Sequence, residues 1–469
     1  MQETHTEGIK HDRARFSSRL GFVIVSVSCA IGLGNVWLMP YRAGVMGGGL
    51  YVIMVAFFAI TLGIPVLMTE YAVGRGSQRS ISQHYHILQP KGTKWHIASY
   101  MGIAGNYFLL MFYMVVCGFT LAYLLRGITG ELIGATPDEV SVAFASLTSS
   151  PIQTVGFMAV SVVFSFLACI GGLKKGVEFF SKYLTLMFFA LILVLILRAL
   201  TLPGAIEGLA FAFVPNLEAV AEHGIFNIVH TAMGQALFSL SVGIGSMAVF
   251  GSYLGKERSL VNEARTVGLL DLSGTLLCLI MIFPAAFAFD ISPQVGPGLI
   301  FVTLPNVFNQ MPLPYVWSLM FYIGLAAVSF STAIAVCENV VSICIDRFGW
   351  GRKKSVLINM LFIITLCLPA ALGFNVLAHI TIPGGNLPNF TISGFWTYLV
   401  MENILPLGAI VYLGFATRKN GWGWNNFLAE VNSGSGQKLS SAMRLYMTYV
   451  VPLAILFIFA FGHINRWVL

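Results

Sequence analysis

The sequence predicts an all-α polytopic membrane protein with about eleven transmembrane helices. Composition is the first observation behind this fold class, because 57% of the 469 residues are hydrophobic and only 10% are charged. The mean hydropathy is +0.82, and one soluble core cannot bury so much apolar surface. The second observation is a series of apolar runs, each near the roughly 20 residues that a helix needs to cross a bilayer. The third is a glycine-rich break in two of these runs.

The apolar runs follow one another along the whole chain and are joined by short connections. We expect transmembrane helices at 20–44, 48–73, 98–125, 154–171, 180–202, 226–253, 264–289, 314–345, 355–373, 392–415 and 442–463. The first twenty residues are polar and lack the apolar region and cleavage site of a signal peptide. One connection, 292–312, is too apolar for an open loop. We expect it to fold back into the extracellular vestibule as a lid.

Basic residues indicate the orientation of the chain. All but four of the 26 lysines and arginines lie in the N-terminal tail or in loops on the same side of the membrane, the exceptions being Arg42, Arg126, Arg198 and Arg466. Because basic loops stay in the cytoplasm, we expect a cytoplasmic N-terminus and an extracellular or periplasmic C-terminus in a plasma (inner) membrane. The net charge of +7 is thus a signal of topology, and no nucleic-acid partner is expected.

The first and sixth runs contain breaks where a membrane helix should be continuous. In the first run, AIGLGN places Gly32 and Gly34 on either side of Leu33. In the sixth, FSLSVGIG places Gly243 and Gly245 beside two serines. Glycines also permit close helix packing, and either break alone fits that explanation equally well. Irregular backbone at membrane depth, however, persists only around a site or cavity, so two breaks five helices apart predict an inverted-repeat transporter.

Two expected five-helix repeats and the segments that flank them divide the chain into four parts. We expect a cytoplasmic tail at 1–19, a first five-helix repeat at 20–202, a second, inverted repeat at 203–415, and a cytoplasmic loop with the eleventh helix at 416–469. A broken helix offers free amide groups to a carboxylate and free carbonyl groups to an ammonium group or Na⁺. The breaks therefore suit an amino acid and sodium as ligands.

Several long stretches carry a resemblance to a known family. Among them are SRLGFVIVSVSCAIGLGNVWLMPY (18–41), GIPVLMTEYAVGRGS (63–77), GQALFSLSVGIGSM (234–247) and CENVVSICIDRFG (337–349). The chain resembles the neurotransmitter:sodium symporter family over almost its whole length. The resemblance implies the leucine-transporter type of fold, two inverted five-helix repeats with helices 1 and 6 unwound. It also implies a secondary active transporter, not an enzyme, that works by alternating access with Na⁺ as the coupling ion.

The resemblance implies two sodium sites. The first would use the Ala30 carbonyl, the Asn35 side chain, Ser239, Asp271 and the substrate carboxylate. The second would use the carbonyls of Ser28, Ile31 and Val328 and the hydroxyls of Ser331 and Thr332. Hard oxygen ligands suit Na⁺, although serine and threonine in membrane helices often bond only to their own helix. Asp271 differs, because a carboxylate inside a span is costly and by default functional.

Substrate-binding residues follow from the same resemblance. The substrate carboxylate would meet the amides of Leu33 and Gly34 and the Tyr113 hydroxyl. The amino group would meet the carbonyls of Ala30, Phe238 and Ser239 and the Ser241 hydroxyl. The side-chain pocket would be lined by Leu109, Phe238, Ile244, Thr332 and Val336. Because this pocket is apolar, we expect a neutral, hydrophobic L-amino acid; without the resemblance, Tyr113 and Phe238 would count as packing aromatics.

The resemblance also predicts gates on both sides of the site. The cytoplasmic gate would consist of Arg13, Tyr253 and Asp346. On the outer side, the family's usual arginine and aspartate are replaced by Leu38 and Thr397. The outer side therefore cannot close through the usual ion pair, although Arg42, one turn further along, can serve in part.

Two further departures concern chloride and helix 5. A tyrosine that helps to bind chloride in animal members of the family is Val55 here, and Asp271 already supplies a negative charge beside the first sodium site. We therefore expect transport to be independent of chloride. The proline expected in helix 5, ten residues after Gly176, is Leu186, so the way this helix admits water to the second sodium site stays open.

Other classes of protein fit the sequence less well. A channel needs a continuous polar path, whereas the polar residues here concentrate at one depth. An intramembrane protease needs an HExxH motif or paired aspartates, which the sequence lacks. Two alternatives stay open: a membrane sensor that binds its substrate without transporting it, and a symporter of another small zwitterion. The expected partners are the lipid bilayer and a small amino acid, and no oligomeric state follows from the sequence.

Overall fold

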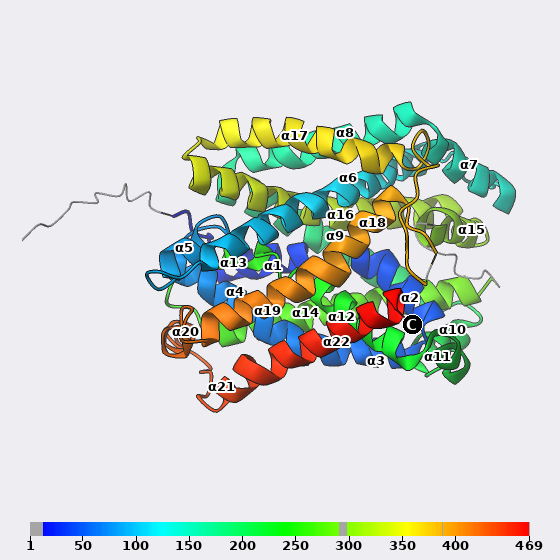
Figure 1. The fold of residues 1–469 in the computed structure, drawn as a ribbon. Coiled ribbons are helices and arrows are strands. Elements are labelled where there is room, and N and C mark those ends of the chain that lie inside the picture. The colour runs from blue at the N-terminus through cyan, green and yellow to red at the C-terminus, as the bar shows by residue number, and fades with distance from the viewer. Residues whose placement is uncertain (1–12, 290–297, 387, 469) are drawn as a thin grey trace, which may run out of the picture.

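Residues 13–289, 298–386 and 388–468 are described by the computed structural model, and their secondary structure is helical. Within these ranges the only extended pairings are three isolated β-bridges. The long helices run side by side from one end of the molecule to the other (Figure 1). The predicted all-α fold is therefore confirmed.

Nine helical stretches of the described chain are long and apolar enough to cross a membrane. They are Gly49–Ser77, Trp95–Thr129, Pro151–Ile170, Leu173–Leu200, Leu260–Phe287, Pro314–Phe348, Arg352–Leu372, Ile392–Thr417 and Met443–Trp467. A tenth span is a pair of helices, α1 (Arg19–Ala30) and Gly34–Val45, bent by 51° at the first predicted break. The sixth predicted run holds α12 (Ile225–Ser239) and α13 (Ser246–Gly251), which flank the second break.

The spans are built from α-helices of very different lengths. Their bounds are α2 (Met39–Val45), α3 (Gly49–Phe58), α4 (Ile64–Ser77), α6 (Ala98–Thr129), α8 (Pro151–Ile170), α9 (Phe179–Leu200), α14 (Leu260–Phe287), α16 (Pro314–Phe348), α17 (Arg352–Leu372), α18 (Ile392–Tyr398), α19 (Leu405–Thr417), α21 (Met443–Leu445) and α22 (Val451–Trp467). Wider π-helical turns join or precede several of them: η1 (Gly34–Leu38), η2 (Ala59–Gly63), η4 (Leu173–Glu178), η6 (Leu399–Ile404) and η7 (Tyr446–Val450). Such turns often mark functional sites.

Short helices occupy the connections between spans. They are α5 (His84–Leu88), α7 (Pro137–Ser149), α10 (Ala205–Phe213), α11 (Leu217–His223), η5 (Leu299–Thr303), α15 (Leu304–Asn309) and α20 (Trp424–Val431), while the 3₁₀ turn η3 (Trp95–Ile97) begins the span Trp95–Thr129. The apolar connection 292–312 is described from residue 298 onward, and there η5 and α15 are buried and α15 packs on α16. Residues 292–297 lie outside the described part, and the role of this connection as a lid stays a prediction.

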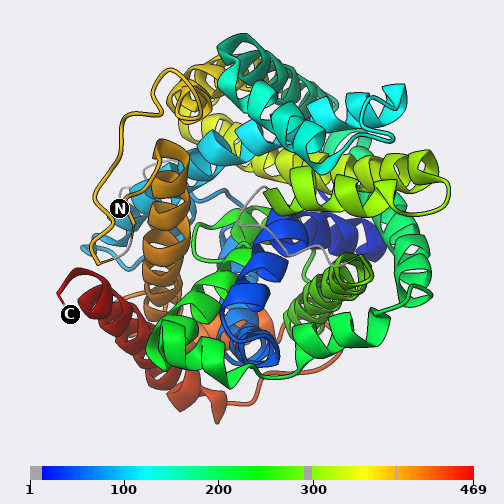
Figure 2. The same cartoon turned by 90° about the vertical axis from the view of Figure 1, so that its right-hand side faces the viewer.

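Burial separates inner helices from outer ones. The spans α6 and α16 are the most completely buried, and every side chain of α1 from Gly21 to Ala30 is buried. By contrast, α9 and α22 expose leucine and phenylalanine side chains on the outside of the bundle, where lipid would cover them. In the view along the bundle, the blue α1–α2 segment lies within a ring of other helices (Figure 2). The first break is therefore enclosed by protein, as irregular backbone at membrane depth requires.

Candidate functional site

The two broken helices meet inside the bundle. α1 ends at Ala30 and helical geometry resumes at Gly34, while the second unwound stretch covers 240–245. Between the two breaks, the Ser241 hydroxyl donates a hydrogen bond to the Cys29 carbonyl oxygen at 2.8 Å. This bond joins the two unwound segments directly.

Left-handed backbone makes the second unwound stretch possible. Ser241, Gly243 and Gly245 have φ angles of 51°, 103° and 74°. Glycine adopts such angles without steric cost, which explains why both glycines of the predicted break are needed. At Ser241 the same conformation costs about 1–3 kcal/mol and indicates a functional constraint at this position.

Glu70 of α4 binds the amide groups that the second break leaves free. This fully buried carboxylate accepts hydrogen bonds from the amide nitrogens of Gly243 at 2.5 Å, Gly245 at 3.3 Å and Ala248 at 3.3 Å. Because unpaired amides are costly inside a membrane, Glu70 allows the helix to remain open. Its role was not predicted, although a carboxylate inside the apolar run 48–73 was the available signal.

Asn106 of α6 holds the same stretch from another side. Its side-chain nitrogen donates to the carbonyl oxygens of Gly102 and Ile244, both at 2.8 Å. Its side-chain oxygen accepts from the Ser246 hydroxyl at 3.1 Å and from the Asn339 amide at 3.3 Å. Donors and acceptors of the unwound stretch thus have fixed partners, which were not foreseen from the sequence.

A charged cluster of four buried side chains lies beside the first break. Asn35 Nδ2 is 2.8 Å from Ser239 Oγ, 3.0 Å from Asp271 Oδ1 and 2.7 Å from Thr275 Oγ1. The Ser239 hydroxyl lies 2.8 and 2.7 Å from the two Asp271 carboxylate oxygens. The structure therefore brings together the three side chains predicted for the first sodium site. Thr275 was missed, although its position one turn after Asp271 places both on one face of α14.

A second, uncharged cluster lies where α16 meets the end of α1. Thr332 Oγ1 is 2.7 Å from the Ser28 carbonyl oxygen, 3.0 Å from that of Ile31 and 3.1 Å from that of Val328. The Ser331 hydroxyl donates to the same Val328 oxygen at 3.0 Å. All five residues predicted for the second sodium site thus lie together, and two different helices supply them.

A small cavity lies at the breaks and adjoins both clusters. Its walls are Cys29, Ala30, Gly32, Gly34, Asn35, Leu109, Tyr113, Phe238, Ser241, Ile244, Thr332, Val400 and Leu405. Of the predicted substrate-binding residues, Leu33, Ser239 and Val336 are buried but do not line it. Val400 in η6 and Leu405 in α19 belong to the span Ile392–Thr417, the tenth predicted helix, which is called helix 10 below. Neither was predicted, because no motif distinguishes them from other apolar residues of that helix.

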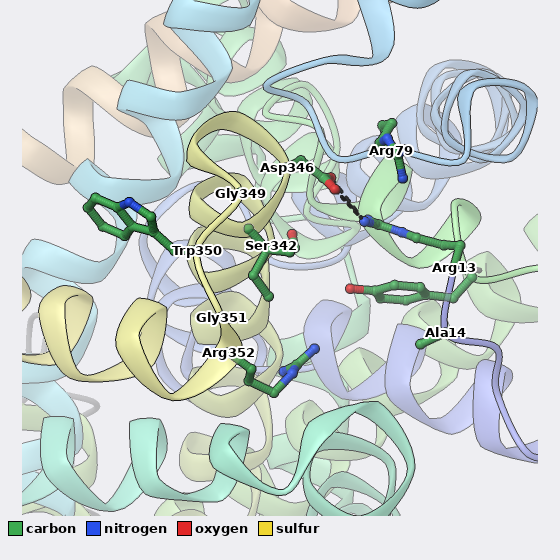
Figure 3. A pocket seen from close by; sticks show the side chains of 11 residues that line it. Arg13, Ala14, Arg79, Ser342, Asp346, Gly349, Trp350, Gly351 and Arg352 are labelled. Carbon is green, nitrogen blue, oxygen red and sulfur yellow. Dashed lines mark hydrogen bonds and ion pairs between the residues drawn. The ribbon is translucent and has the colours of Figure 1, made fainter. Parts of the chain in front are cut away.

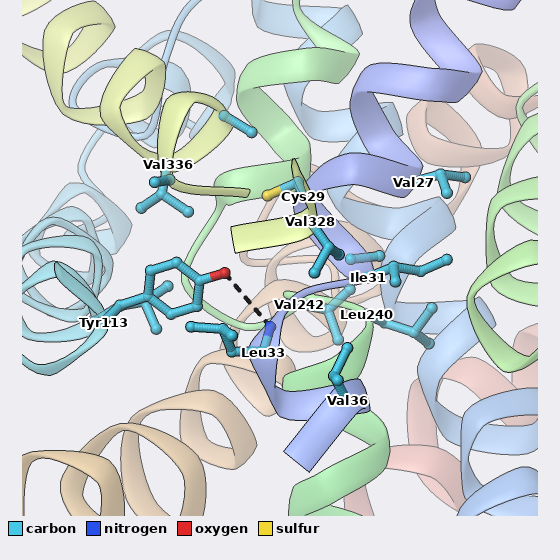
Figure 4. Packing of buried hydrophobic residues seen from close by; sticks show 14 of the residues in the cluster. Val27, Cys29, Ile31, Leu33, Val36, Tyr113, Leu240, Val242, Val328 and Val336 are labelled. Carbon is cyan, nitrogen blue, oxygen red and sulfur yellow. Dashed lines mark hydrogen bonds between the residues drawn. The ribbon is translucent and has the colours of Figure 1, made fainter. Parts of the chain in front are cut away.

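Tyr113 reaches the first break from α6. Its hydroxyl lies 3.5 Å from the Leu33 amide nitrogen (Figure 4). The same hydroxyl donates to the Ser329 carbonyl oxygen at 3.3 Å. The structure thus brings together two of the groups predicted to bind the substrate carboxylate. Space here is limited, since a Cβ added at Gly32 would lie 3.1 Å from this hydroxyl.

Arg13 connects the predicted cytoplasmic gate residues, and Figure 3 shows its ion pair with Asp346. Arg13 Nη1 lies 2.8 and 3.0 Å from the two carboxylate oxygens of Asp346. The Arg13 guanidinium also lies 4.7 Å from the centre of the Tyr253 ring and donates to the Ser252 hydroxyl at 2.9 Å. A mostly buried, multiply bonded arginine of this kind is held more firmly than an exposed ion pair. It joins the N-terminal segment to α16.

A second ion pair adjoins the gate. The Tyr253 hydroxyl donates to Glu338 Oε1 at 2.8 Å, and Arg352 Nη1 lies 2.7 Å from Glu338 Oε2. Neither Glu338 nor Arg352 was predicted. The signal available for Glu338 was again a carboxylate within an apolar run, 314–345.

Comparisons with known proteins agree with this architecture. The chain is 32% identical to an uncharacterized sodium-dependent transporter of Bacillus subtilis, over 95% of this chain and 96% of that protein. It is 26% identical to the sodium- and chloride-dependent taurine transporter of Rattus norvegicus, over 80% of this chain and 68% of that protein. It is also similar to the crystal structure of MhsT in complex with L-phenylalanine, with a TM-score of 0.86, 32% identity and coverage of 96% of this chain and 100% of MhsT.

A family-wide comparison gives the same result. The profile of the sodium:neurotransmitter symporter family matches residues 13–143 and 146–467. These ranges include both breaks, both clusters and the cytoplasmic gate. The expectation of a transporter instead of an enzyme is confirmed, and the chain belongs to the sodium:neurotransmitter symporter family.

Proposed function

We propose that the chain couples inward movement of Na⁺ to uptake of a neutral, hydrophobic L-amino acid by alternating access. The observation that carries the proposal is the second cluster, where Thr332 Oγ1 lies within hydrogen-bond distance of the Ser28, Ile31 and Val328 carbonyl oxygens. Such a set of neutral, hard oxygens suits Na⁺. A cation there would hold α1 against α16 and stabilise the enclosed state.

The first cluster would couple the ion to the substrate. Asn35 bonds to Asp271 and also lines the cavity. A substrate carboxylate in the cavity would therefore reach the ion held by Asn35, Ser239, Asp271 and the Ala30 carbonyl. Ion and substrate would complete each other's site, which is the physical basis of symport.

The cavity walls support a neutral, hydrophobic substrate. Leu109, Phe238, Ile244, Val400 and Leu405 surround it, and no lysine, arginine, aspartate or glutamate is among its lining residues. A charged substrate side chain would lose its hydration there without a partner. The phenylalanine bound to MhsT, a protein 32% identical to this chain, agrees with this choice.

Two observations support a second candidate function, the symport of another small zwitterion. Taurine and GABA transporters are among the relatives, at 26% and 24% identity, and both substrates are small zwitterions. The Leu33 amide and the Tyr113 hydroxyl would bind the anionic group of either class.

We further propose that transport does not require chloride. Two sodium ions and a zwitterion would place excess positive charge at the cavity, and Asp271 already supplies a buried negative charge there. The named animal relatives are chloride-dependent, so this proposal sets the chain apart from them.

The proposed topology has a cytoplasmic N-terminus and a C-terminus on the outer side of the plasma (inner) membrane. The described N-terminal segment and the end of α22 lie at opposite ends of the bundle (Figure 1). This arrangement agrees with an odd number of spans. On this topology Arg13 and Asp346 face the cytoplasm.

Competition in proteoliposomes tests the substrate and the mode of action together. Uptake of labelled L-phenylalanine in NaCl should saturate, and unlabelled leucine, tryptophan or methionine should suppress it more strongly than taurine, GABA, lysine or glutamate. Stronger suppression by taurine or GABA would favour the second candidate. Sodium-dependent binding of phenylalanine without any saturable uptake would identify a sensor and overturn the proposal.

A further inference from the structure

An ion cluster joins three helices at the outer side of the bundle. Arg42 Nη2 of α2 lies 3.8 Å from Glu402 Oε1 of η6, and Arg466 Nη1 of α22 lies 3.2 Å from Glu402 Oε2. The three side chains are largely buried, with exposed fractions of 11%, 13% and 11%. We propose that this trio is the outer gate of the transporter and that Arg466, in the last helix, sets how easily the gate opens. The proposal rests on the alternating-access mechanism proposed above.

The trio lies about one turn from the positions where the resemblance led us to expect an arginine–aspartate pair. Leu38 and Thr397, at the positions where an arginine and an aspartate were expected, carry no charge, and the Thr397 hydroxyl bonds to the Ser393 carbonyl oxygen of its own helix at 3.0 Å. Arg42 follows Leu38 by four residues, so it lies one turn further along the same helix. An electrostatic link between helices 1 and 10 is therefore retained, displaced toward the outer end.

Arg466 is fixed to the helix 10 side of this link. Its Nε donates to the Gly384 carbonyl oxygen at 3.0 Å, and its guanidinium lies 4.5 and 4.4 Å from the ring centres of Phe390 and Tyr398. The Asn386 amide donates to the Arg466 carbonyl oxygen at 2.8 Å. These contacts hold Arg466 beside Glu402 and none of them involves helix 1.

The two arginines consequently have different roles. Opening the outer side requires α2 to move away from η6, which separates Arg42 from Glu402. Leaving a buried carboxylate without a partner is strongly unfavourable, but Arg466 remains at the shorter distance and keeps Glu402 paired. Arg42 therefore stabilises the closed state, whereas Arg466 lowers the cost of opening.

Hydrogen–deuterium exchange of the full-length protein in lipid nanodiscs tests this division of roles without measuring transport. The reporter is the peptide covering Gly34–Val45, whose amides become more exposed when helix 1 separates from helix 10. Arg42→Gln should speed its exchange about three- to tenfold, the effect of losing an ion pair of roughly 1 kcal/mol. Arg466→Gln should slow it, because Glu402 then depends on Arg42 alone. Glu402→Gln should speed it as Arg42→Gln does.

Two controls separate gating from general damage. Arg126→Gln removes another arginine from an ion pair, with Glu131 at 3.5 Å, and should leave the reporter peptide unchanged. Arg466→Lys keeps a positive charge beside Glu402 and should slow exchange less than Arg466→Gln does. If Arg466→Gln speeds exchange as Arg42→Gln does, Arg466 is a structural anchor and the proposal is wrong. It is equally wrong if Arg42→Gln matches the Arg126→Gln control. A protein that fails to transport yet gives the predicted exchange pattern would overturn the proposed function and leave the ion cluster intact as a conformational link.

Discussion

Asn35 and Ser239 connect helix 1, helix 6 and the Asp271 carboxylate within one hydrogen-bonded cluster. We predict that Asn35→Ala or Ser239→Ala weakens Na⁺ and substrate binding together, each by roughly tenfold, because one buried hydrogen-bonding group is lost from a shared site. The measurement is substrate binding at a series of Na⁺ concentrations. Ser273→Ala, an exposed position of the same helix α14, is the control. A variant whose Na⁺ dependence stays constant while only substrate affinity falls would rule out a shared site.

Asp271 is the residue on which chloride independence depends. Its carboxylate offsets the positive charge of bound cations, so replacing it with a neutral residue should create a need for a mobile anion. We predict that initial uptake by the parent is equal in chloride and in gluconate, and that Asp271→Ser transports more slowly but is stimulated by chloride. A parent that requires chloride, or a folded Asp271→Ser protein with parental rates and no chloride response, would contradict this role. A related hypothesis is that Asp271, once Na⁺ has left, takes up a proton for the return step.

At the residue scale, the structure brings together predicted side chains that carry chemistry of their own or lie in a family motif, and their roles as ligands stay predictions. Asn35, Ser239 and Asp271 lie in one hydrogen-bonded cluster, and Ser28 and Thr332 lie in the second. Thr275, Val400 and Leu405 were missed, since their contribution depends on which helix faces the cavity and a single sequence does not contain that information. Glu70 and Glu338 were also missed, but the sequence did contain a signal for them. Each is a carboxylate inside an apolar run, which is the feature that marked Asp271 as functional.

At the scale of the element, the unwound turn of helix 1 is shaped by Gly34. A Cβ added to Gly34 would lie 2.5 Å from Phe238 Cε1, so the ring would have to move within the cavity wall. We predict that Gly34→Ala reduces affinity for a bulky amino acid such as phenylalanine at least about tenfold, a cost typical of overpacking. The measurement is competition binding in NaCl.

A matched glycine provides the control for this change. Gly156 in the second turn of α8 has no atom within 4 Å of an added Cβ, and Gly156→Ala should leave binding unchanged. If Gly34→Ala binds phenylalanine as tightly as Gly156→Ala does, the Phe238 ring does not bound the substrate side of the cavity, and the proposed pocket needs revision.

The helices themselves were largely predictable, because a twenty-residue apolar run dominates every local preference. The two breaks were also found, since glycine and serine are conspicuous in such runs. The π-helical turns η1, η2, η4, η6 and η7 were not, because one extra residue per turn barely changes the hydrophobicity of the run. The π-turn η4 forms the start of helix 5, the helix in which Leu186 replaces an expected proline. It follows Gly172, whose φ is +77°. Helix 5 therefore begins irregularly, which the sequence did not reveal.

At the scale of the whole molecule, two ion-paired layers enclose one central cavity. The Arg13–Asp346 pair lies on the proposed cytoplasmic side, and the Arg42–Glu402–Arg466 trio lies on the proposed outer side. Alternating access requires that only one layer opens at a time. Sodium bound between α1 and α16 would influence which of the two layers opens. The repeat boundaries at 20–202 and 203–415 remain a prediction.

The energetics of this scheme are sufficient for uphill transport. Each Na⁺ that enters down a tenfold gradient contributes about 1.4 kcal/mol, and a potential of 100 mV adds about 2.3 kcal/mol per charge. Two ions would therefore concentrate a neutral amino acid many-fold, whereas a sensor would not concentrate it at all.

The most direct test of sodium-coupled symport is accumulation in proteoliposomes that contain the purified protein. Labelled amino acid, chosen as the best competitor in the panel above, is added outside Na⁺-free vesicles in NaCl, KCl or choline chloride at equal osmolarity. The account predicts that the internal concentration rises transiently above the external one only in NaCl, and that an ionophore which collapses the Na⁺ gradient abolishes the rise. Uptake that continues undiminished when K⁺ or choline replaces Na⁺ would contradict it.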